Sequence, residues 1–392
     1  MVYNYLMMKK SVKKILKTVL CVVLSVVLIA GGYVAYVVLS YNRIGDKALE
    51  VNGEAESREV ALGVTYKALS YNIGFGAYSQ DYTFFMDTGY DDEGNETCGH
   101  FSTARSKDEV LFNTNGAVNT AFNQNADFIM FQEVDTNSTR SYHIDQNKKI
   151  IEKFVGYNYT HAVNFHTAFL PYPLYDMHGA VNAGLTTLSK YKITSAKRKE
   201  YTVSTSFSKF FDLDRCFSVH EIEISETDKK LYIVNSHMSA YDEGGTVRKT
   251  QIAEMKRFLD EKSGEGHYIV VGGDWNHDLL TFNPDFTYDE TNRPYSMTKK
   301  SPDWVSYMFN ADGKPLIEGY KIVASDNNPS CRNNDIEYEE GKTFVCTVDG
   351  FIVSDNIQVI SHKTIKTGRG KNGVDGFAYS DHEPTEIEFK LL

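Results

Sequence analysis

Side chains that can bind a metal ion or move a proton occur at the ends of several apolar runs in this chain. The runs 68–71, 128–131, 232–234 and 268–271 are each followed within a few residues by an amide, a carboxylate or an imidazole. Two short motifs near the C-terminus add acids and a further histidine. The residues concerned are Asn72, Glu133, His237, Asp274, Asn276, Asp349, Asp381 and His382.

These residue types suit a site that combines a cation with proton transfer. Buried carboxylates cost several kcal/mol unless a partner offsets their charge, and a hard divalent ion accepts carboxylate and amide oxygens as ligands. A histidine held by an acid can keep a proton and stabilise developing negative charge. Each motif taken alone is more often structural than functional, so the inference depends on the complete ordered set.

The segments that must position these side chains alternate between strand-like and helix-like patterns. Neighbouring strands end at a common edge of a sheet, where α/β enzymes gather functional groups. Helices separated by strands and hairpins predict an α/β sandwich of layers. We predict strands over 66–72, 127–131, 184–188, 216–224, 230–235, 267–271, 350–353 and 385–389, and helices over 116–126, 148–154 and 247–261.

Two loops and two cysteines carry further expectations. The acidic segment 81–105 lacks periodicity and predicts a long surface loop. The segment 165–178 is rich in Phe, Tyr and Pro and either lines a pocket or packs on the surface. Cys331 and Cys346 flank a short polar loop, and we favour pairing them in a disulfide, although spacing alone does not fix the geometry.

The N-terminal segment predicts a membrane anchor. Residues 18–40 carry no charge, and at about 1.5 Å per residue they form a helix of about 34 Å, long enough for a hydrocarbon core of about 30 Å. Five lysines precede the run, which predicts a cytoplasmic N-terminus over 1–17 and an extracytoplasmic remainder. We favour an anchor over a cleaved signal peptide because the run exceeds the usual signal length. An irregular stalk over 41–65 and a folded domain over 66–392 would follow.

Net charge limits the partners. The first 39 residues hold five lysines and no acid, so the remainder carries 36 of the 41 basic residues against all 52 acidic ones, a formal charge of −16. A field of that sign repels polyanions and weighs against long DNA or RNA. It does not weigh against a small anion.

In their order along the chain, these motifs resemble the endonuclease/exonuclease/phosphatase superfamily. Its sharpest elements here are Gly273-Asp274-Trp275-Asn276 and Ser380-Asp381-His382. The resemblance covers most of the chain from Tyr66 onward. It implies a four-layered α/β sandwich of two packed sheets flanked by helices, and Mg²⁺-dependent (with Mn²⁺ as an alternative) hydrolysis of phosphoesters.

The resemblance also implies a role for each residue. Asn72, Glu133 and Asp381 would stand at the metal, with Glu133 as its principal ligand. Asp274 and Asn276 would handle the attacking water and a phosphate oxygen, and His237 and His382 would stabilise the transition state. Asp349 would support His382, and Asn182 is a candidate phosphate contact.

Three functions remain open at this point. The first is a phosphodiesterase or phosphatase acting on a small phosphoester or a lipid headgroup, favoured by the run 235–242, which resembles sphingomyelinase-like members. The second is an extracytoplasmic deoxyribonuclease, which would need basic residues beside the cleft; the candidates are Lys190, Lys192, Lys197, Arg198 and Lys199. The third is a non-catalytic, membrane-bound binding module. The oligomeric state is not fixed by the sequence.

Overall fold

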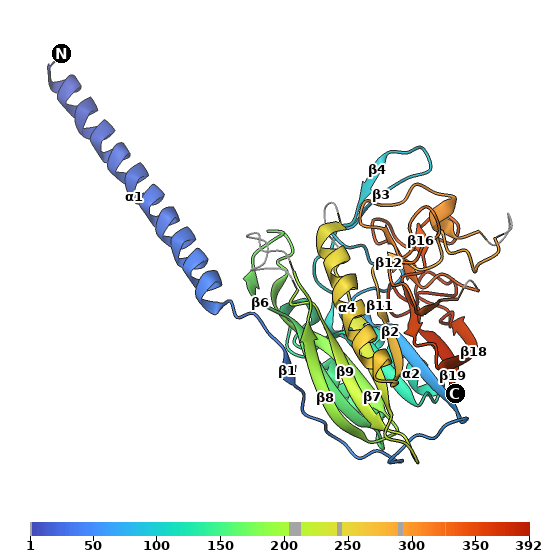
Figure 1. Cartoon of the computed structure of the whole chain (residues 1–392). Helices are drawn as coiled ribbons and strands as arrows, with labels where there is room; N and C mark the ends of the chain where they lie inside the picture. The colour runs from blue at the N-terminus through green and yellow to red at the C-terminus, as the bar shows by residue number, and fades with distance from the viewer. Residues whose placement is uncertain (1, 204–212, 241–244, 289–292, 326) are drawn as a thin grey trace. The chain divides into compact units, whose positions relative to one another are not determined.

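The chain divides into a helical unit, residues 1–43, and a mixed α/β unit, residues 44–392. This computed structural model describes residues 2–203, 213–240, 245–288, 293–325 and 327–392 (Figure 1). The first unit consists of α1 (Val2–Ser40). Within the described residues, its part Lys10–Ser40 is the one helix that is long and apolar enough to cross a membrane.

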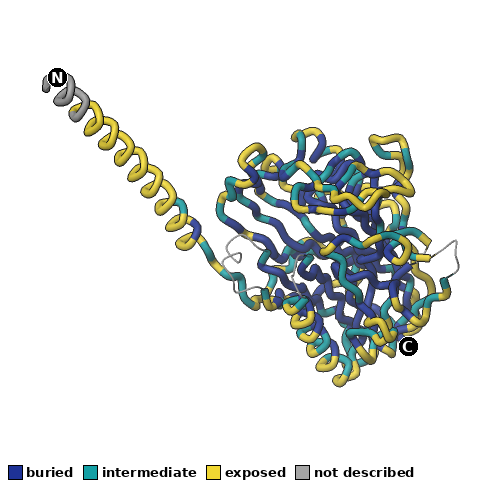
Figure 2. Tube along the Cα trace, turned by 90° about the horizontal axis from the view of Figure 1, so that it is seen from above, coloured by how far each residue is buried: buried dark blue, intermediate teal, exposed yellow. Residues whose placement is uncertain are grey.

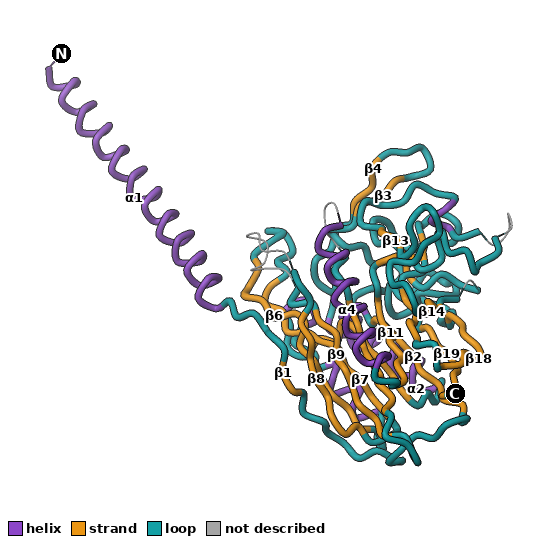
Figure 3. The backbone as a smooth tube through the Cα atoms, in the orientation of Figure 1, coloured by secondary structure: helices purple, strands orange, loops and turns teal. Residues whose placement is uncertain are grey.

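Two β-sheets form the centre of the second unit (Figure 3). In spatial order, the seven-stranded sheet contains β1 (Lys47–Ala48), β8 (Ile193–Glu200), β9 (Cys216–Glu223), β10 (Lys230–His237), β11 (Tyr268–Asp274), β17 (Asp349–Val353) and β14 (Lys321–Val323). The six-stranded sheet contains β18 (Ile357–Thr364), β19 (Thr385–Leu391), β2 (Thr65–Asn72), β5 (Phe128–Asp135), β7 (Gly179–Ser189) and β6 (Asn158–Leu170).

Shorter elements decorate the sheets. Three two-stranded pairs are β3 (Thr88–Tyr90) with β4 (Glu96–Cys98), β12 (His277–Asp278) with β13 (Ser306–Tyr307), and β15 (Cys331–Arg332) with β16 (Val345–Cys346). Short 3-10 turns lie at Gly74–Gly76, Thr139–Ser141 and Tyr295–Met297.

Helices cover the outer face of each sheet, so the expected four layers are confirmed. Side chains of both sheets meet in one apolar core, which includes Phe128 and Ile233. The helices α2 (Lys107–Asn123) and α3 (Gln146–Lys153) pack on the outside of the six-stranded sheet, and α4 (Thr246–Gly264) packs on the outside of the seven-stranded one. The strands are correspondingly buried along most of their length (Figure 2).

Local sequence accounts for where these elements begin. Ser106 caps α2 by accepting the Glu109 N–H, which places the helix start nine residues before the predicted position 116. Asp145 caps α3 in the same way. The predicted strands are all present, whereas β6, β8 and β18 were not predicted. The segments 193–200 and 357–364 alternate only weakly and carry polar or charged residues; β18 is an edge strand, and only the two-residue β1 lies outside β8.

The segment 41–65 is not a free stalk in this structure. From Ile44 onward it belongs to the folded unit, where Lys47 and Ala48 pair with β8 and Val60 bridges to Ile224. The segment 81–105 is likewise more than a surface loop, because it contains β3 and β4 and buries Tyr82 and Asp87. The mostly polar composition of both segments concealed these contacts.

Strand register brings several chain segments to one end of the two sheets. β10 and β11 run parallel with His237 opposite Asp274, and β17 runs antiparallel to β11 with Asp349 opposite Asp274. In the other sheet, β2 and β5 run parallel with Asn72 opposite Gln132. The C-terminal ends of two parallel strand pairs therefore meet across the sandwich.

A buried histidine links the two sheets away from that end. The Thr160 hydroxyl on β6 donates to His220 Nε2 on β9 at 2.7 Å, and His220 Nδ1 donates to the Ile233 carbonyl at 2.9 Å. Burial lowers the pKa of His220 to about 4. Because the unfolded chain binds the proton near pH 6.5, stability is complete above that pH and falls as pH drops towards 4.

We therefore predict that His220→Gln flattens the pH dependence of stability. The titration of His220 alone should lower the wild-type free energy of unfolding by about 2 kcal/mol between pH 7 and pH 4.5. The variant should be less stable than wild type at pH 7, but its free energy of unfolding should fall less on acidification. Urea unfolding followed by tryptophan fluorescence measures both; an equally steep acid loss in the variant would contradict the assignment.

Candidate active site

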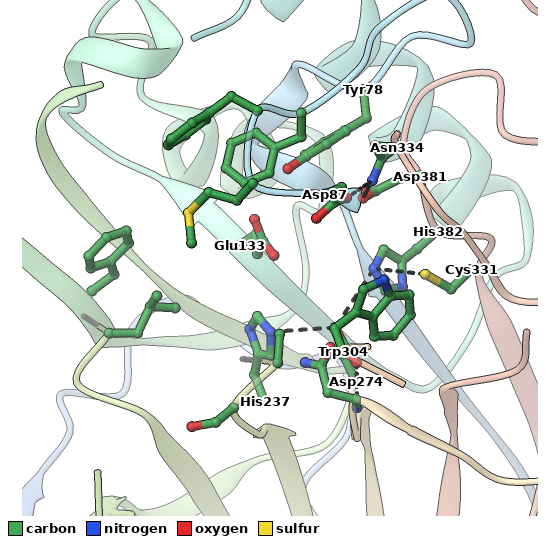
Figure 4. A pocket seen from close by; sticks show the side chains of 18 of the residues that line it. Tyr78, Asp87, Glu133, His237, Asp274, Trp304, Cys331, Asn334, Asp381 and His382 are labelled. Atoms are coloured by element: carbon green, nitrogen blue, oxygen red, sulfur yellow. Dashed lines mark hydrogen bonds and ion pairs between the residues drawn. The ribbon is translucent and has the colours of Figure 1, made fainter. Parts of the chain in front are cut away.

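One atom shows how closely the separate segments converge. The side-chain nitrogen of Asn72, at the end of β2, lies 3.0 Å from Asp274 Oδ2, 3.3 Å from Glu133 Oε1 and 3.5 Å from His382 Nε2. These residues are up to 310 positions apart in sequence. The structure therefore brings together the groups that the sequence motifs nominated (Figure 4).

Three side chains form a line across the site, joined by one hydrogen bond and one ion pair. His382 Nδ1 donates to Asp349 Oδ2 at 2.7 Å, and His382 Nε2 lies 3.7 Å from Asp274 Oδ2. Ser330 donates its hydroxyl proton to the same Asp349 oxygen at 2.8 Å. Asp349 is fully buried, and its other oxygen, Oδ1, has no hydrogen-bond partner among the described residues. The histidine is thus held between two carboxylates, one of them inaccessible to solvent.

The charges in this line shift the pKa values of its members. Burial by itself would lower the pKa of His382, but the Asp349 carboxylate and the neighbouring Cys331 and Asp274 raise it well above its usual value. Burial raises the pKa of Asp274 to about 6, while His382 acts in the opposite direction. At neutral pH this favours a protonated histidine beside an ionised aspartate.

His237 differs from His382 in its protonation. Burial, together with the positive charges of Arg215 and His382, lowers the pKa of His237 well below its usual value. Its Nε2 lies 3.4 Å from Asp274 Oδ2. A neutral imidazole carries no charge, so His237 does not share the protonated state of His382.

Two of the candidate residues are among those with a left-handed backbone conformation. Glu133 has φ = +54° and Asn276 has φ = +48°, a region that L-residues other than Gly, Asn and Asp seldom adopt. Glu133 lies where the pairing of β5 with β7 shifts register, between Phe131 and Val134. The bulge turns the Glu133 carboxylate towards the cavity instead of leaving it in the sheet alternation. Burial raises the pKa of that carboxyl.

Asp274 and Asn276 form a tight turn at the end of β11. The Asn276 N–H donates to Asp274 Oδ1 at 2.9 Å, and the Asn276 amide donates to the Met238 carbonyl at 2.9 Å. The preceding Gly273 is required by packing, since a Cβ there would lie 2.0 Å from the Ser236 carbonyl oxygen on β10. The glycine lets the two parallel strands carry His237 and Asp274 to adjacent positions.

A second polar cluster lies beside Glu133 and was not found from the sequence. The Asn334 amide nitrogen donates to Asp381 Oδ2 and to Asp87 Oδ2, each at 2.9 Å. Asn334 is buried, and its Oδ1 has no hydrogen-bond partner among the described residues. Asp381 also accepts from Ser380 at 3.2 Å. No motif pointed to Asp87 or Asn334, because each lies in an irregular polar segment.

Most of these groups line one cavity of about 200 Å³, whereas Asn72 and Asp349 lie behind its wall and contact residues that line it. Acidic residues line part of its wall, three arginines line another part, and a third part is apolar. The arginines, also missed from the sequence, are Arg140, Arg215 and Arg332; the apolar residues include Phe84, Phe85, Phe165, Leu170, Leu213 and Trp304. Acids that can hold a cation therefore lie opposite guanidinium groups that can hold an anion.

The donor set fits a hard divalent cation. Asp274, Asp349 and His382 offer ligand atoms within 4.8 Å of one another. However, one Asp349 oxygen and His382 Nδ1 are already committed to each other. Glu133 and Asp381 supply carboxylate oxygens on the cavity wall. In this conformation Asn72 presents its N–H groups to the carboxylates, while its oxygen accepts from Gly74 N–H, so it orients Glu133 rather than offering a ligand atom.

The structure does not support two of the expectations from the sequence, the role of Asn182 and the disulfide. Asn182 donates its amide to Thr136 at 2.8 Å and is not among the described residues that line the cavity. Cys331 and Cys346 face each other on β15 and β16, but both thiols are free, so the favoured disulfide is absent. Cys331 Sγ instead lies 3.7 Å from His382 Nε2.

The aromatic segment 165–178 serves both of its expected purposes. Phe165, Leu170 and His178 line the cavity, whereas Leu174 and Tyr175 are exposed. The motif run 235–242 is described only as far as Ala240; Tyr241 and Asp242 lie outside the described residues.

With this geometry in place, comparisons with known proteins define the class. The model of the endonuclease/exonuclease/phosphatase family matches residues 110–382, more than half of the chain. The chain therefore belongs to the endonuclease/exonuclease/phosphatase family and has its phosphoesterase-type fold. No curated protein gives a significant match.

Solved structures agree on the fold. ANGEL2, a 2′,3′-cyclic phosphatase solved with adenosine-2′,3′-vanadate, aligns with TM-score 0.50 and 14% identity over 88% of this chain and 98% of its own. An endonuclease/exonuclease/phosphatase from Beutenbergia cavernae aligns with TM-score 0.50 and 12% identity over 83% and 72%. TDP2 of D. rerio, solved with a single-strand DNA product, aligns with TM-score 0.49 and 11% identity over 83% of this chain and 99% of its own. At these identities the likeness concerns the fold alone.

We predict that Asp349→Asn lowers the pKa of His382. The change keeps the shape of the side chain but removes the buried negative charge, so the variant should titrate at least about one pH unit below wild type. Histidine NMR signals followed against pH measure this directly.

Ser330→Ala is the matched control for this experiment. It removes a hydrogen bond to Asp349 without changing any charge, and it should move the His382 titration much less. An unchanged midpoint in Asp349→Asn would show that the carboxylate does not control the histidine.

Proposed function

We propose that this protein is a membrane-tethered, Mg²⁺-dependent hydrolase of phosphoester bonds, with phosphodiesters as its preferred class. The observation that carries the proposal is the line Asp349–His382–Asp274, which meets Asn72 and Glu133 in a cavity that also contains three arginines. Membership of the family supports the reaction class.

A phosphoester is an anion, so the site must offset charge before water can attack. Glu133 and Asp381 would hold the Mg²⁺ ion, with Mn²⁺ as the alternative. The bound ion would supply neutralisation of the phosphate and polarisation of a P–O bond. Arg140, Arg215 and Arg332 line the same cavity and would attract the phosphate anion. Arg140 also pairs with Asp135, and Arg332 donates to the Ser79 carbonyl.

Asp274 is the proposed general base. Its Oδ1 is fixed by the Asn276 N–H, and its Oδ2 faces Asn72 and His237. With a pKa of about 6 it is ionised at neutral pH and can still accept a proton from water. Asn276 would orient the water or a phosphate oxygen without adding negative charge.

The two histidines would act differently on the phosphoryl group. His382, kept protonated by Asp349, would stabilise negative charge in the transition state or donate to the leaving oxygen. His237, which is neutral, would donate a hydrogen bond to the same centre. Asn182 contacts Thr136 and has no place in this scheme.

The charge distribution favours a small phosphoester or a lipid headgroup over DNA. The basic cluster 190–199 does not form a groove: Arg198 is buried and donates to the carbonyl of Val163, and Lys199 pairs with Asp46. Lys190 follows β7 at the end opposite the site. A deoxyribonuclease remains the second candidate, because the family whose model matches this chain includes endonucleases and exonucleases. A non-catalytic module would not require the observed convergence of acids and histidines.

Loss of the base or of the histidine should abolish hydrolysis. The purified full chain should hydrolyse bis(p-nitrophenyl) phosphate with Mg²⁺ and should stop when EDTA is added. Asp274→Asn and His382→Gln should each lower kcat by about 10³-fold, as expected for loss of a positioned base or acid.

Two exposed residues provide controls of the same types. Asp312→Asn lies in a surface turn, and His143→Gln lies outside the cavity; both should retain wild-type rates. Metal-independent activity, or full activity in Asp274→Asn, would refute the proposed chemistry. Faster cleavage of plasmid DNA than of small phosphodiesters would favour the nuclease alternative.

The tether and its orientation form a separate proposal. The length and composition of α1 support a spanning helix, and the lysines before the span favour a cytoplasmic N-terminus. The folded unit would then lie outside the cytoplasm.

Cysteine labelling tests this orientation. Cys98 is exposed and free on the folded unit, whereas Cys21 lies within the apolar helix. A membrane-impermeant maleimide added to intact cells should label the wild-type chain, and Cys98→Ser should remove that label. Labelling only after the cells are lysed would place the folded unit in the cytoplasm.

A further inference from the structure

One stretch of the folded unit exposes an unusual density of apolar and aromatic side chains. In residues 169–177, which connect β6 to β7, the exposed fraction of Leu174 reaches 76%. The segment contains no lysine, arginine or glutamate. Its other exposed large side chains are Phe169, Tyr172, Tyr175 and Met177. Clustered exposure of this kind marks a surface that contacts a partner.

The segment is fixed in place rather than loosely attached. Its one charged residue, Asp176, accepts hydrogen bonds from the backbone N–H groups of Ser102 and Thr103 at 2.7 and 3.0 Å. The Tyr175 hydroxyl donates to the His100 carbonyl at 2.9 Å, and the two rings stack 5.0 Å apart. The apolar tips therefore point outward because their neighbours are anchored inward.

The same segment forms the rim of the candidate active site. Leu170 and His178, at its two ends, line the cavity. The ring of Tyr172 packs against Phe85 at 5.8 Å, and Phe85 and Met86 also line the cavity. Met86 is itself about half exposed. A molecule that contacts this rim lies at the cavity entrance.

The start of the folded unit is hydrogen-bonded through Arg198 to segments that adjoin the cavity. Arg198 Nη1 donates to the carbonyls of Ile44, where the folded unit begins, and of Gly45. The same guanidinium donates to the Asp214 carbonyl at 2.7 Å and to the Val163 carbonyl at 2.9 Å. The neighbours Leu213 and Arg215 line the cavity.

The short link between α1 and the folded unit limits how far the rim can lie from the membrane. Only residues 41–43 join α1 to the folded unit. A bilayer spanned by α1 must therefore begin within about 10–15 Å of Ile44 along the chain. Because Ile44 is tied through Arg198 to residues that adjoin the cavity wall, the bilayer is the partner that so short a connection brings within reach of the apolar rim.

From these observations we propose that the rim, residues 169–177 with Phe85 and Met86, docks into the interfacial layer of the bilayer that anchors the chain. Docked in this way, the rim delivers a lipid phosphoester to the cavity. The proposal rests on the proposed phosphoesterase function and on the tether. Tyrosine, leucine and methionine suit the boundary between headgroups and acyl chains, and the absence of free acids avoids repulsion from anionic lipids.

Fluorescence quenching tests the docking without any assay of activity. Leu174→Trp and Val155→Trp are compared in the full chain, reconstituted in phosphatidylcholine vesicles with and without brominated acyl chains. Val155 is 82% exposed but precedes the far end of β6, so it is the matched control. Bromolipid should quench the tryptophan at 174 beyond the wild-type background and leave the one at 155 unaffected. Equal quenching of the two variants would overturn the proposal.

A measurement of activity provides a second test of the docking proposal. Leu174→Glu should lower the ratio of hydrolysis of vesicle phosphatidylinositol or sphingomyelin to hydrolysis of soluble bis(p-nitrophenyl) phosphate by about tenfold, because it puts a charge where docking would place an apolar side chain in the lipid. Val155→Glu should leave the ratio unchanged. An unchanged ratio in Leu174→Glu, with soluble hydrolysis intact, would overturn the docking proposal while the proposed function stands. Quenching at 174 with no hydrolysis of any substrate would support docking and overturn the proposed function.

Discussion

Asp274 and Asp349 are both buried, both contact His382, and lie in register on adjacent strands. Two ionised carboxylates so close together would repel each other strongly in a low-dielectric interior. The protonated imidazole between them offsets part of that repulsion. Glu133, Asp381 and Asp87 add further negative charge around the same cavity. This excess of negative charge is the constraint on the site. The arginines and the proposed cation offset it, and it helps to raise the pKa values of the buried acids and of His382.

Polar contacts between the sheets keep this arrangement in register. Gln132, one residue before Glu133, donates to the side chain of Asn235, two residues before His237, at 2.8 Å. Asn235 in turn donates to the Phe131 carbonyl at 3.1 Å. Buried amides that satisfy each other fix one relative position of the two sheets, since a shift by one residue would leave them unpaired. The strand ends of both sheets are therefore held at a common level beneath the cavity.

The sequence predicted the site residues that lie at strand ends. It did not predict those that reach the cavity only through contacts between distant segments of the chain. Asn72, Glu133, His237 and Asp274 follow apolar runs, so parallel pairing brings two of them to the edge of each sheet, and packing of the two sheets brings these edges together. Asp87, Asn334 and the three arginines lie in segments without periodicity, and only the folded chain shows that they face the cavity. Asn182 lies within β7, and its amide donates to Thr136 instead of facing the cavity.

The N-terminal boundary shows the same limit. Residues 44–60 are polar and irregular, yet they add β1 to the sheet edge through backbone hydrogen bonds, which do not depend on side-chain pattern. The protonation of His237 could not be predicted either, because it follows from complete burial and from the position of Arg215. The residue types indicate which chemical groups are present at the site, whereas packing determines the protonation state of each group.

The position of a bound Mn²⁺ ion, located by its anomalous scattering in crystals of the protein, tests the central claim most directly. A single strong peak within about 2.2 Å of carboxylate oxygens of Glu133 and Asp381, facing Asp274 across the cavity, is the result we expect. A cavity without a peak at saturating Mn²⁺, or an ion bound out of reach of Glu133, would show that the gathered carboxylates serve another purpose.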